Sequence, residues 1–525
     1  MAITSAQISV LSSAQLDKLS SDATGALTTQ ALAGLNKTNM PGLSLSELSG
    51  DGQIEALSTA QFAALTGTQI GALTEDQAAK ITPTQAAAIT ASQITNLTAA
   101  NLAMLSPKAF AGLTPAAIDA LVDSGLSQIQ AITADQAKLM TPLQAKQLDA
   151  GVVDSLATDT VAALAPATLA AIPSAAVSAL PSAAFSALTG VQVAAMTTGQ
   201  FASLSANALT QLGSVQAAAI TSSQIKALDS TDLTSLSSEA VAALTPASLA
   251  AVPSTAFFKL ASDAFGAFTP AQIAALTPAQ LSVLDNTGTS TAAATAAGQI
   301  SSFGSAQTAA LTSKQVTSIA ALDAVNFSAD GFAGLTPAAF SVLKFGSLGA
   351  TQLGYITASQ AASLTSTQIG LLTSTTVAAL TAEAVAALKP TALKGLATGS
   401  TAAIAGLSVD ALGVITSTQL AGLSTTQLEQ LTAVQIQSLS ESALTYLASK
   451  GYTVISNATA ANSGVETSTT IAPGNFSSFI TAGAKAVTIT GGNVADTILG
   501  SALNDSISGG GTGNDSIAAG AGNDT

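Results

Sequence analysis

The stretch that decides the fold is Thr269-Pro-Ala-Gln-Ile-Ala-Ala-Leu276, followed at once by Thr277-Pro-Ala-Gln-Leu-Ser-Val-Leu284. The second octad repeats the Thr, Pro, Gln and Leu of the first and keeps an apolar residue at the fifth place. The same unit, Thr-x-x-Gln-apolar-x-x-Leu, recurs from the start of the chain to about residue 450. A short fixed period of this kind predicts a stacked repeat array and not a series of globular domains.

Each octad carries its own helix-start signal when its places are numbered 0 to 7. Thr or Ser at position 0 is a good N-cap, and Gln at position 3 completes a capping box with it. The apolar residue at position 4 and the Leu that precedes the octad form a hydrophobic staple. Ala, a strong helix former, fills most of positions 5 and 6. We therefore predict one helix of about one and a half turns per octad.

Proline tests this interpretation independently. A proline inside a continuous helix costs about 3 kcal/mol, whereas at the first helical position its missing N–H is harmless. Ten of the fifteen prolines stand at position 1. These are Pro83, Pro107, Pro115, Pro142, Pro166, Pro246, Pro270, Pro278, Pro337 and Pro390. One long helix is therefore excluded.

Three further prolines, Pro173, Pro181 and Pro253, stand at position 0, and a serine follows each. There we expect the N-cap to move one place along the chain, as to Ser174.

Helices this short are unstable alone in water, so the octads must bury their apolar residues against one another. We predict a mainly α fold, a solenoid or superhelix of very short helices, over residues 1–284 and 300–450. The octads shift phase near 48–52, 121–132 and 343–357, and a Gly/Thr/Ser-rich insertion occupies 285–299. That insertion is either a binding loop or a tolerated insertion. A disordered spacer and a β-solenoid with threonine ladders are the alternatives to the helical array. The strict apolar register disfavours the first, and the Ala content and the prolines disfavour the second.

Composition excludes several classes of function. The 525 residues include 14 basic and 29 acidic ones, a net charge of −15, with no His, Cys or Trp. An acidic chain is a poor partner for nucleic acid. No apolar run approaches the roughly 18 residues of a membrane span, so we predict no membrane insertion. Without His and Cys there is no Ser-His-Asp triad, cysteine nucleophile or His-Glu-x-x-His zinc site. We therefore predict that the chain is not an enzyme.

The chemistry changes after residue 450. Over 451–490, a short β segment is predicted, with Val, Ile and Thr replacing Ala and Leu. A nine-residue repeat then fills 491–525. It reads Gly491-Gly-Asn-Val-Ala-Asp-Thr-Ile-Leu499, Gly500-Ser-Ala-Leu-Asn-Asp-Ser-Ile-Ser508, Gly510-Gly-Thr-Gly-Asn-Asp-Ser-Ile-Ala518 and Ala519-Gly-Ala-Gly-Asn-Asp-Thr525.

These turns resemble the calcium-binding nonapeptides of RTX (repeats-in-toxin) proteins, Gly-Gly-x-Gly-x-Asp-x-apolar-x. The turn at 510–518 fits fully, the last one has Ala519 for the first Gly, and the first two have Val494 and Leu503 in place of the later Gly. Calcium prefers oxygen ligands, which carboxylates and turned-in carbonyls supply. The resemblance implies the start of a parallel β-roll and a Ca²⁺ cofactor. The implied site residues are Asp496, Asp505, Gly511, Gly513, Asp515, Gly520, Gly522 and Asp524.

The resemblance also implies type I secretion to the cell surface of a Gram-negative bacterium. The N-terminus agrees, since it lacks the basic and apolar regions of a cleaved secretory signal. Because the chain stops at Thr525 in mid-repeat, we expect it to be a portion of a longer protein.

The favoured function is an extracellular structural protein that assembles with copies of itself in a calcium-dependent way, as a surface layer (S-layer), filament or adhesin subunit. Cell-surface polysaccharide is a second expected partner. The alternative is a carbohydrate- or ice-binding adhesin rod, in which regular rows of hydroxyls match a repetitive ligand.

Overall fold

The computed structural model describes residues 3–525 except 51, 125, 261, 285–298, 320–325, 397–402, 433–434, 437, 451–453, 456–478, 482–487, 491–496, 501–503 and 512–513. The chain forms two compact units, Met1–Ala264 and Phe265–Thr525. The predicted insertion at 285–299 lies outside the described residues, apart from Gln299.

The first unit is a series of short helices. They are α1 (Ser5–Ser9), α2 (Ser13–Leu16), α3 (Ser21–Gly25), α4 (Thr29–Leu32), η1 (Met40–Gly42), η2 (Leu45–Glu47), α5 (Thr59–Ala64), α6 (Gly67–Gly71), α7 (Glu75–Ala79), α8 (Pro83–Ala86), α9 (Ala91–Ile94), α10 (Ala99–Met104), α11 (Pro107–Gly112), α12 (Pro115–Ser124), α13 (Leu126–Ile129), α14 (Ala134–Leu139), α15 (Pro142–Ala145), α16 (Ala150–Ser155), α17 (Thr158–Ala163), α18 (Pro166–Ala171), α19 (Ser174–Val177), α20 (Ser182–Ala187), α21 (Gly190–Ala195), α22 (Thr198–Ala202), α23 (Ala206–Thr210), α24 (Ser214–Ala217), α25 (Ser222–Ala227), α26 (Ser230–Ser235), α27 (Ser238–Ala243), α28 (Pro246–Ala250) and α29 (Ser254–Phe257).

The series continues with α30 (Ser262–Gly266), α31 (Pro270–Ala275), α32 (Pro278–Ser282), α34 (Ser305–Thr308), α35 (Ser313–Ser318), α36 (Ala329–Gly334), α37 (Pro337–Phe340), η4 (Phe345–Ser347), α38 (Ala350–Leu353), α39 (Ala358–Ala361), α40 (Ser366–Ile369), α41 (Ser374–Val377), α42 (Ala382–Ala387), α43 (Pro390–Leu393), η5 (Ile404–Gly406), α44 (Val409–Gly413), α45 (Ser417–Leu420), α46 (Thr425–Leu428) and α48 (Glu441–Ser449). The predicted mainly helical array of very short helices is confirmed.

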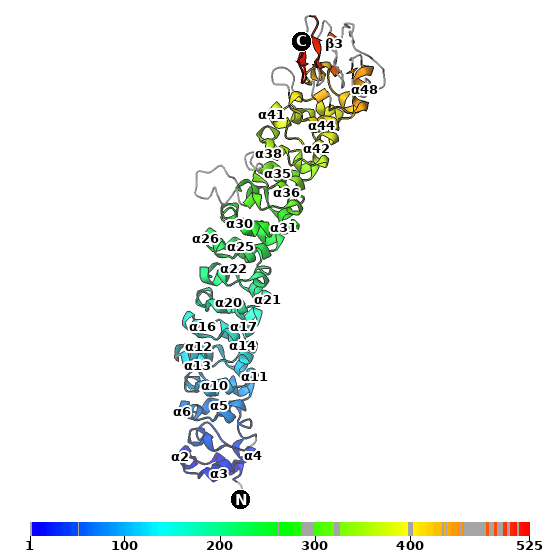
Figure 1. Ribbon diagram of the computed structural model, residues 1–525. Helices are drawn as coiled ribbons and strands as arrows, with labels where there is room; N and C mark the ends of the chain where they lie inside the picture. The colour runs from blue at the N-terminus through cyan, green and yellow to red at the C-terminus, as the bar shows by residue number, and fades with distance from the viewer. Residues whose placement is uncertain are drawn as a thin grey trace. The chain divides into compact units, whose positions relative to one another are not determined.

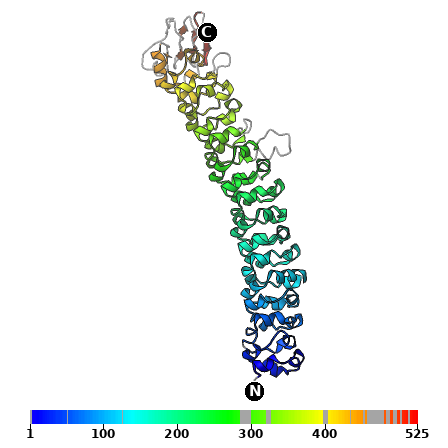
Figure 2. The same cartoon turned by 180° about the vertical axis from the view of Figure 1, so that it is seen from behind.

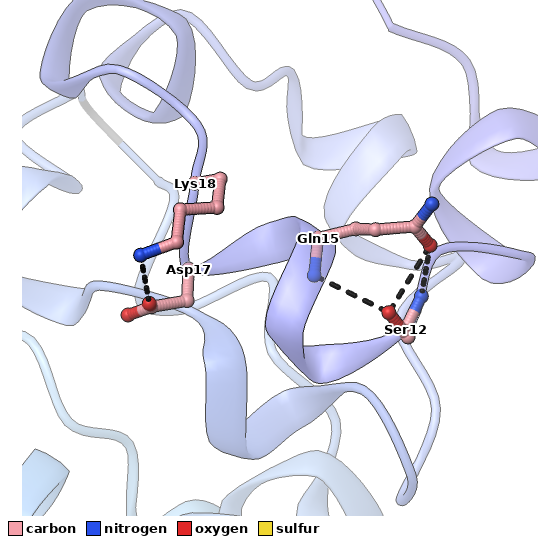
Figure 3. Close-up of polar contacts among 4 residues, drawn as sticks. All are labelled: Ser12, Gln15, Asp17 and Lys18. Atoms are coloured by element: carbon pink, nitrogen blue, oxygen red, sulfur yellow. Dashed lines mark hydrogen bonds and ion pairs between the residues drawn. The ribbon is translucent and has the colours of Figure 1, made fainter.

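The predicted helix-start signal operates as expected. At the start of α31, the N–H of Thr269 donates to Gln272 Oε1 at 2.7 Å, and the N–H of Gln272 donates to Thr269 Oγ1 at 3.3 Å. Figure 3 shows the same capping box between Ser12 and Gln15, beside an exposed ion pair. The box satisfies amide groups that a helix start would otherwise leave unpaired, so each octad begins a helix of its own.

The expected cap shift at the three position-0 prolines is wrong. Pro173 is itself the N-cap of α19, with φ −56° and ψ 141°, and no side chain caps the helix. Pro181 and Pro253 cap α20 and α29 in the same way. The proline ring holds φ near the value that an N-cap needs, and proline has no N–H for a glutamine to accept from. Ala, and not Gln, stands at position 3 of all three octads.

Within each unit the helices stack in coils. A helix packs on the one three places further along the chain, as α8 on α11, α11 on α14, and α14 on α17 (Figure 1). The same stacking is seen from behind in Figure 2. The apolar residues at positions 4 and 7 form the core: Leu169 and Ile172, for example, are buried. A narrow core of this kind grows with every added octad.

A feature that the capping-box interpretation missed connects one coil to the next. The buried Gln200 accepts the N–H of Thr197 through Oε1, while its Nε2 donates to the carbonyls of Leu169 and Ile172 at 2.8 and 2.7 Å. Ile172 lies 28 residues earlier, which is three and a half octads. We call the position-3 glutamines that bond in this way the glutamine ladder. Each satisfies an N–H at its own helix start and carbonyls at a helix end one coil earlier.

The ladder shows how the array absorbs its phase shifts. The separation is 28 residues for Gln224 and Met196, but 31 for Gln144 and Leu113, beyond the shift near 121–132, where three residues are added. The separation is 25 residues for Gln360 and Leu335, beyond the shift near 343–357, and 39 for Gln307 and Phe268, beyond residues 285–298. Each change in separation equals the number of residues added to or missing from the octad register, so the ladder continues across every shift.

The end of the second unit contains strands. They are β1 (Val454–Ile455), β2 (Phe479–Thr481), β3 (Thr488–Thr490), β4 (Thr497–Leu499), β5 (Ser506–Ser508) and β6 (Ser516–Ala518). One sheet has the order β1-β2-β4-β6 and the other pairs β3 with β5, and all pairs are parallel. From β2 to β6, successive strands therefore alternate between the two sheets. Strands β1, β2 and β3 lie within residues 451–490, where the sequence predicts a short β segment.

Candidate calcium-binding turns

The nonapeptide strands position the candidate site. In β4 and β6, Thr497 pairs with Ser516 and Ile498 with Ile517, so equivalent residues of the motif lie side by side. Ile498 is fully buried. The motif aspartates Asp505 and Asp515 immediately precede β5 and β6.

Two of the predicted ligands are brought together. The N–H of Asp505 donates to Asp524 Oδ1 at 2.9 Å, and the N–H of Thr525 donates to the carbonyl of Asp505 at 2.8 Å. The N–H of Asn523 donates to Asn504 Oδ1 at 2.8 Å, and that of Gly500 to the carbonyl of Ala518 at 2.7 Å. The turns before β5 and at the end of the chain therefore stack directly on one another.

Glycine shapes these turns where a side chain would not fit. A Cβ added at Gly500 would lie 2.7 Å from Asp505 Oδ2 and would also collide with the carbonyl of Ala519. One added at Gly509 would collide with the carboxylate of Asp515. The sequence reasoning missed both glycines as site residues, although each closely follows a strand and precedes a motif Asp. The two carboxylates therefore lie against bare backbone.

Among the other predicted residues, Gly520 and Gly522 have φ of +96° and +143°, a region that favours glycine. Gly511 is exposed, and it is its neighbour Gly510 that has a positive φ, +88°. Asp524 and Asp515 are half-buried. Asp496 and Gly513 lie outside the described residues.

The donor set fits calcium in type. Asp505 is only 2% exposed, and a buried carboxylate is costly unless donors or a cation offset its lost hydration. Hard oxygen donors from carboxylates and backbone carbonyls are the ligands that calcium prefers. Within the described ranges, no three or more Asp, Glu, His or Cys side chains form a group able to hold a metal ion. Asp505, Asp524 and the carbonyls of their turns are the groups that would hold calcium here.

Comparison with known proteins adds one match. The family model of the ALTTAQ repeat matches residues 51–83, which contain α5, α6 and α7. Its letters correspond to the octads, as in Ala56-Leu-Ser-Thr-Ala-Gln61. No curated protein matches the chain. In the part of the chain that the structure describes, no helix has both the length and the apolar character needed to cross a bilayer.

Proposed function

We propose that this chain is an extracellular structural protein that assembles with copies of itself when calcium is bound, as a surface-layer, filament or adhesin subunit. Residues 491–525 would begin an RTX-type β-roll, and secretion would place the protein at the surface of a Gram-negative bacterium. The observation that carries the proposal is the direct stacking of the turn containing Asp505 on the turn containing Asp524.

The strand topology supports the β-roll. Strands that alternate between two parallel sheets, with each turn ending in a motif Asp, are what repeated nonapeptides require. Calcium would supply positive charge between carboxylates of stacked turns and so hold one coil on the next. The chain would position the ligand oxygens, and its glycines would leave room for the carboxylates.

The octad array supports a structural role. The buried position-3 glutamines and the apolar residues at positions 4 and 7 join one coil to the next, and the chain has no His or Cys to serve as nucleophile, base or soft metal ligand. We therefore also propose that it is no enzyme. Cell-surface polysaccharide remains a proposed second partner.

Light scattering and electron microscopy of the full chain, with millimolar-range calcium or with a chelator, test the proposal. We expect ordered assemblies only with calcium, and none from the double variant Asp505→Asn/Asp524→Asn. Asp22→Asn is the matched control, because it changes an exposed carboxylate on α3 that is far in sequence from the nonapeptides. This variant should assemble as the parent does. A monodisperse monomer in both buffers would refute the assembly proposal.

A further inference from the structure

Three of the four most exposed large aliphatic side chains of the described residues share one octad position. Val10, Val191, Val215 and Leu143 are 80, 68, 68 and 60% exposed. All except Val10 occupy position 2 of their octads. Single exposed apolar residues need no explanation, but exposed aliphatic residues at one repeat position raise the question of an interaction surface.

These three side chains belong to helices that pack in one column. Leu143 lies on α15, Val191 on α21 and Val215 on α24, and α18 between them carries the exposed Ala167 at the same octad position. In the first unit α15 packs on α18, α18 on α21, and α21 on α24. A Cβ added at Gly190 would lie 3.1 Å from Ala219 Cβ and 3.3 Å from the Val215 carbonyl, so α21 and the segment after α24 touch here. Leu143, Ala167, Val191 and Val215 form what we call the aliphatic stripe.

Three of the four stripe residues, Ala167, Val191 and Val215, lie in a run without charge, whereas Leu143 lies before that run, three residues from Lys146. Residues 160–225 contain no Asp, Glu, Lys or Arg, the longest such run in a chain whose net charge is −15. Stacked helices such as α15 and α18 start 24 residues apart, so the run spans more than two coils and surrounds this part of the first unit on every side. The helices α15, α18, α21 and α24 themselves carry no charged residue. The column's next position-2 residue, Glu239 on α27, ends the stripe.

We infer that the aliphatic stripe pairs with the same stripe of a second copy of this chain. Two acidic chains repel each other wherever their carboxylates come close, and the uncharged region is the part of the first unit where that repulsion is least. A surface that is neutral, apolar and regularly spaced suits an identical surface, as a two-fold interface requires. This inference rests on the proposed self-assembly and names a surface for it that needs no calcium.

An antiparallel arrangement matches the stripe's own order. The four residues run Leu, Ala, Val, Val at intervals of 24 residues. When the second copy is reversed, Leu143 faces the partner's Val215, and Ala167 faces the partner's Val191. Large residues then face small ones at the centre, which lets the helices approach closely. Because the stripe is one residue wide, we expect a weak, concentration-dependent dimer.

Sedimentation equilibrium of the full chain in a chelator tests the pairing. Val191→Glu/Val215→Glu should raise the dimer dissociation constant by more than about tenfold, because like charges would then face each other. Both sites lie in the first turn of a helix, where an acidic residue is well tolerated, and far-UV circular dichroism should be unchanged. Val10→Glu makes the same change at a more exposed valine outside the stripe and should leave dimerisation within about twofold of the parent.

Two outcomes would overturn the inference. The first is that the chain stays monomeric at all concentrations in chelator. If this monomer also co-sediments with neutral lipid vesicles, the stripe would be assigned to a lipid surface. The second is a dimer unaffected by the stripe variant. The two proposals fail separately. If the chain assembles with calcium and the stripe variant assembles equally well, only the stripe is refuted. If the stripe variant abolishes a dimer but calcium causes no assembly, only the calcium proposal is refuted.

Discussion

The octads and the nonapeptides both build coils, but they join one coil to the next with different groups. In the octads a neutral side chain, such as Gln200, bridges to carbonyls of the coil before it. In the nonapeptides the contact runs through backbone pairing and the carboxylates of Asp505 and Asp524. A neutral amide carries its own donors and its own acceptor, whereas stacked carboxylates need positive charge from elsewhere. The first kind of coil is complete in itself, and the proposed calcium ion would complete the second.

The largest expected effect follows from that difference. With a chelator, we expect amide hydrogen exchange to accelerate by orders of magnitude in β4, β5 and β6 while the helices stay protected, because only the strands would lose a bound cation. Hydrogen–deuterium exchange mass spectrometry of the full chain with and without calcium measures both regions at once. Equal protection of the strands in both buffers would contradict the comparison.

Loss of a single glutamine of the glutamine ladder should destabilise its surroundings nearly as much. Gln200→Ala leaves the Thr197 N–H and the Ile172 carbonyl without this partner, while the Leu169 carbonyl keeps the N–H of Ile172. We expect a local loss of roughly 2–6 kcal/mol, at about 1–3 kcal/mol for each of the two groups. The readout is hydrogen exchange around α18 and α22, since long arrays need not unfold in two states. Gln7→Ala removes the same capping residue at an exposed position in α1 and should cost about 1 kcal/mol or less.

The proline caps offer a smaller and sharper test. Pro181→Thr introduces an N–H that Ala184 cannot accept, at a cost of about 1–2 kcal/mol. Adding Ala184→Gln should recover that loss, with a coupling energy of about 1–2 kcal/mol in the double-mutant cycle. Additive effects of the two changes would show that proline and alanine occur together at these octads for another reason.

The smallest effect concerns acid. The N–H groups of Asp232 and Thr231 donate to Asp229 and lower the pKa of this exposed N-cap carboxyl below 3.8. A lowered folded pKa gives stability that is present above pH 3.8 and is lost as the pH falls through the folded value. Asp229→Ser keeps a capping oxygen that does not titrate, so the stability difference from the parent should shrink in that window. A carbon-13 titration of Asp229 with its midpoint at or above 3.8 would disprove the shift.

Prediction from sequence succeeded where the signal was local. A capping box joins residues three places apart, so Thr269 and Gln272 could be recognised without a structure. It failed at Pro173, because the absence of an N–H mattered more than the serine hydroxyl beside it. For the candidate site, the sequence motif indicated Asp505 and Asp524 as ligands, but not that Gly500 and Gly509 leave the space against which the carboxylates of Asp505 and Asp515 lie.

The sequence by itself determined where each helix starts and that the chain would be an array, because those properties depend on contacts within a few residues. Only the tertiary structure decided that each helix packs on the one three places further along, that Gln200 reaches Ile172, and that the turns of Asp505 and Asp524 meet. Those pairings depend on how many short helices complete one coil, which side-chain packing sets and no single octad encodes.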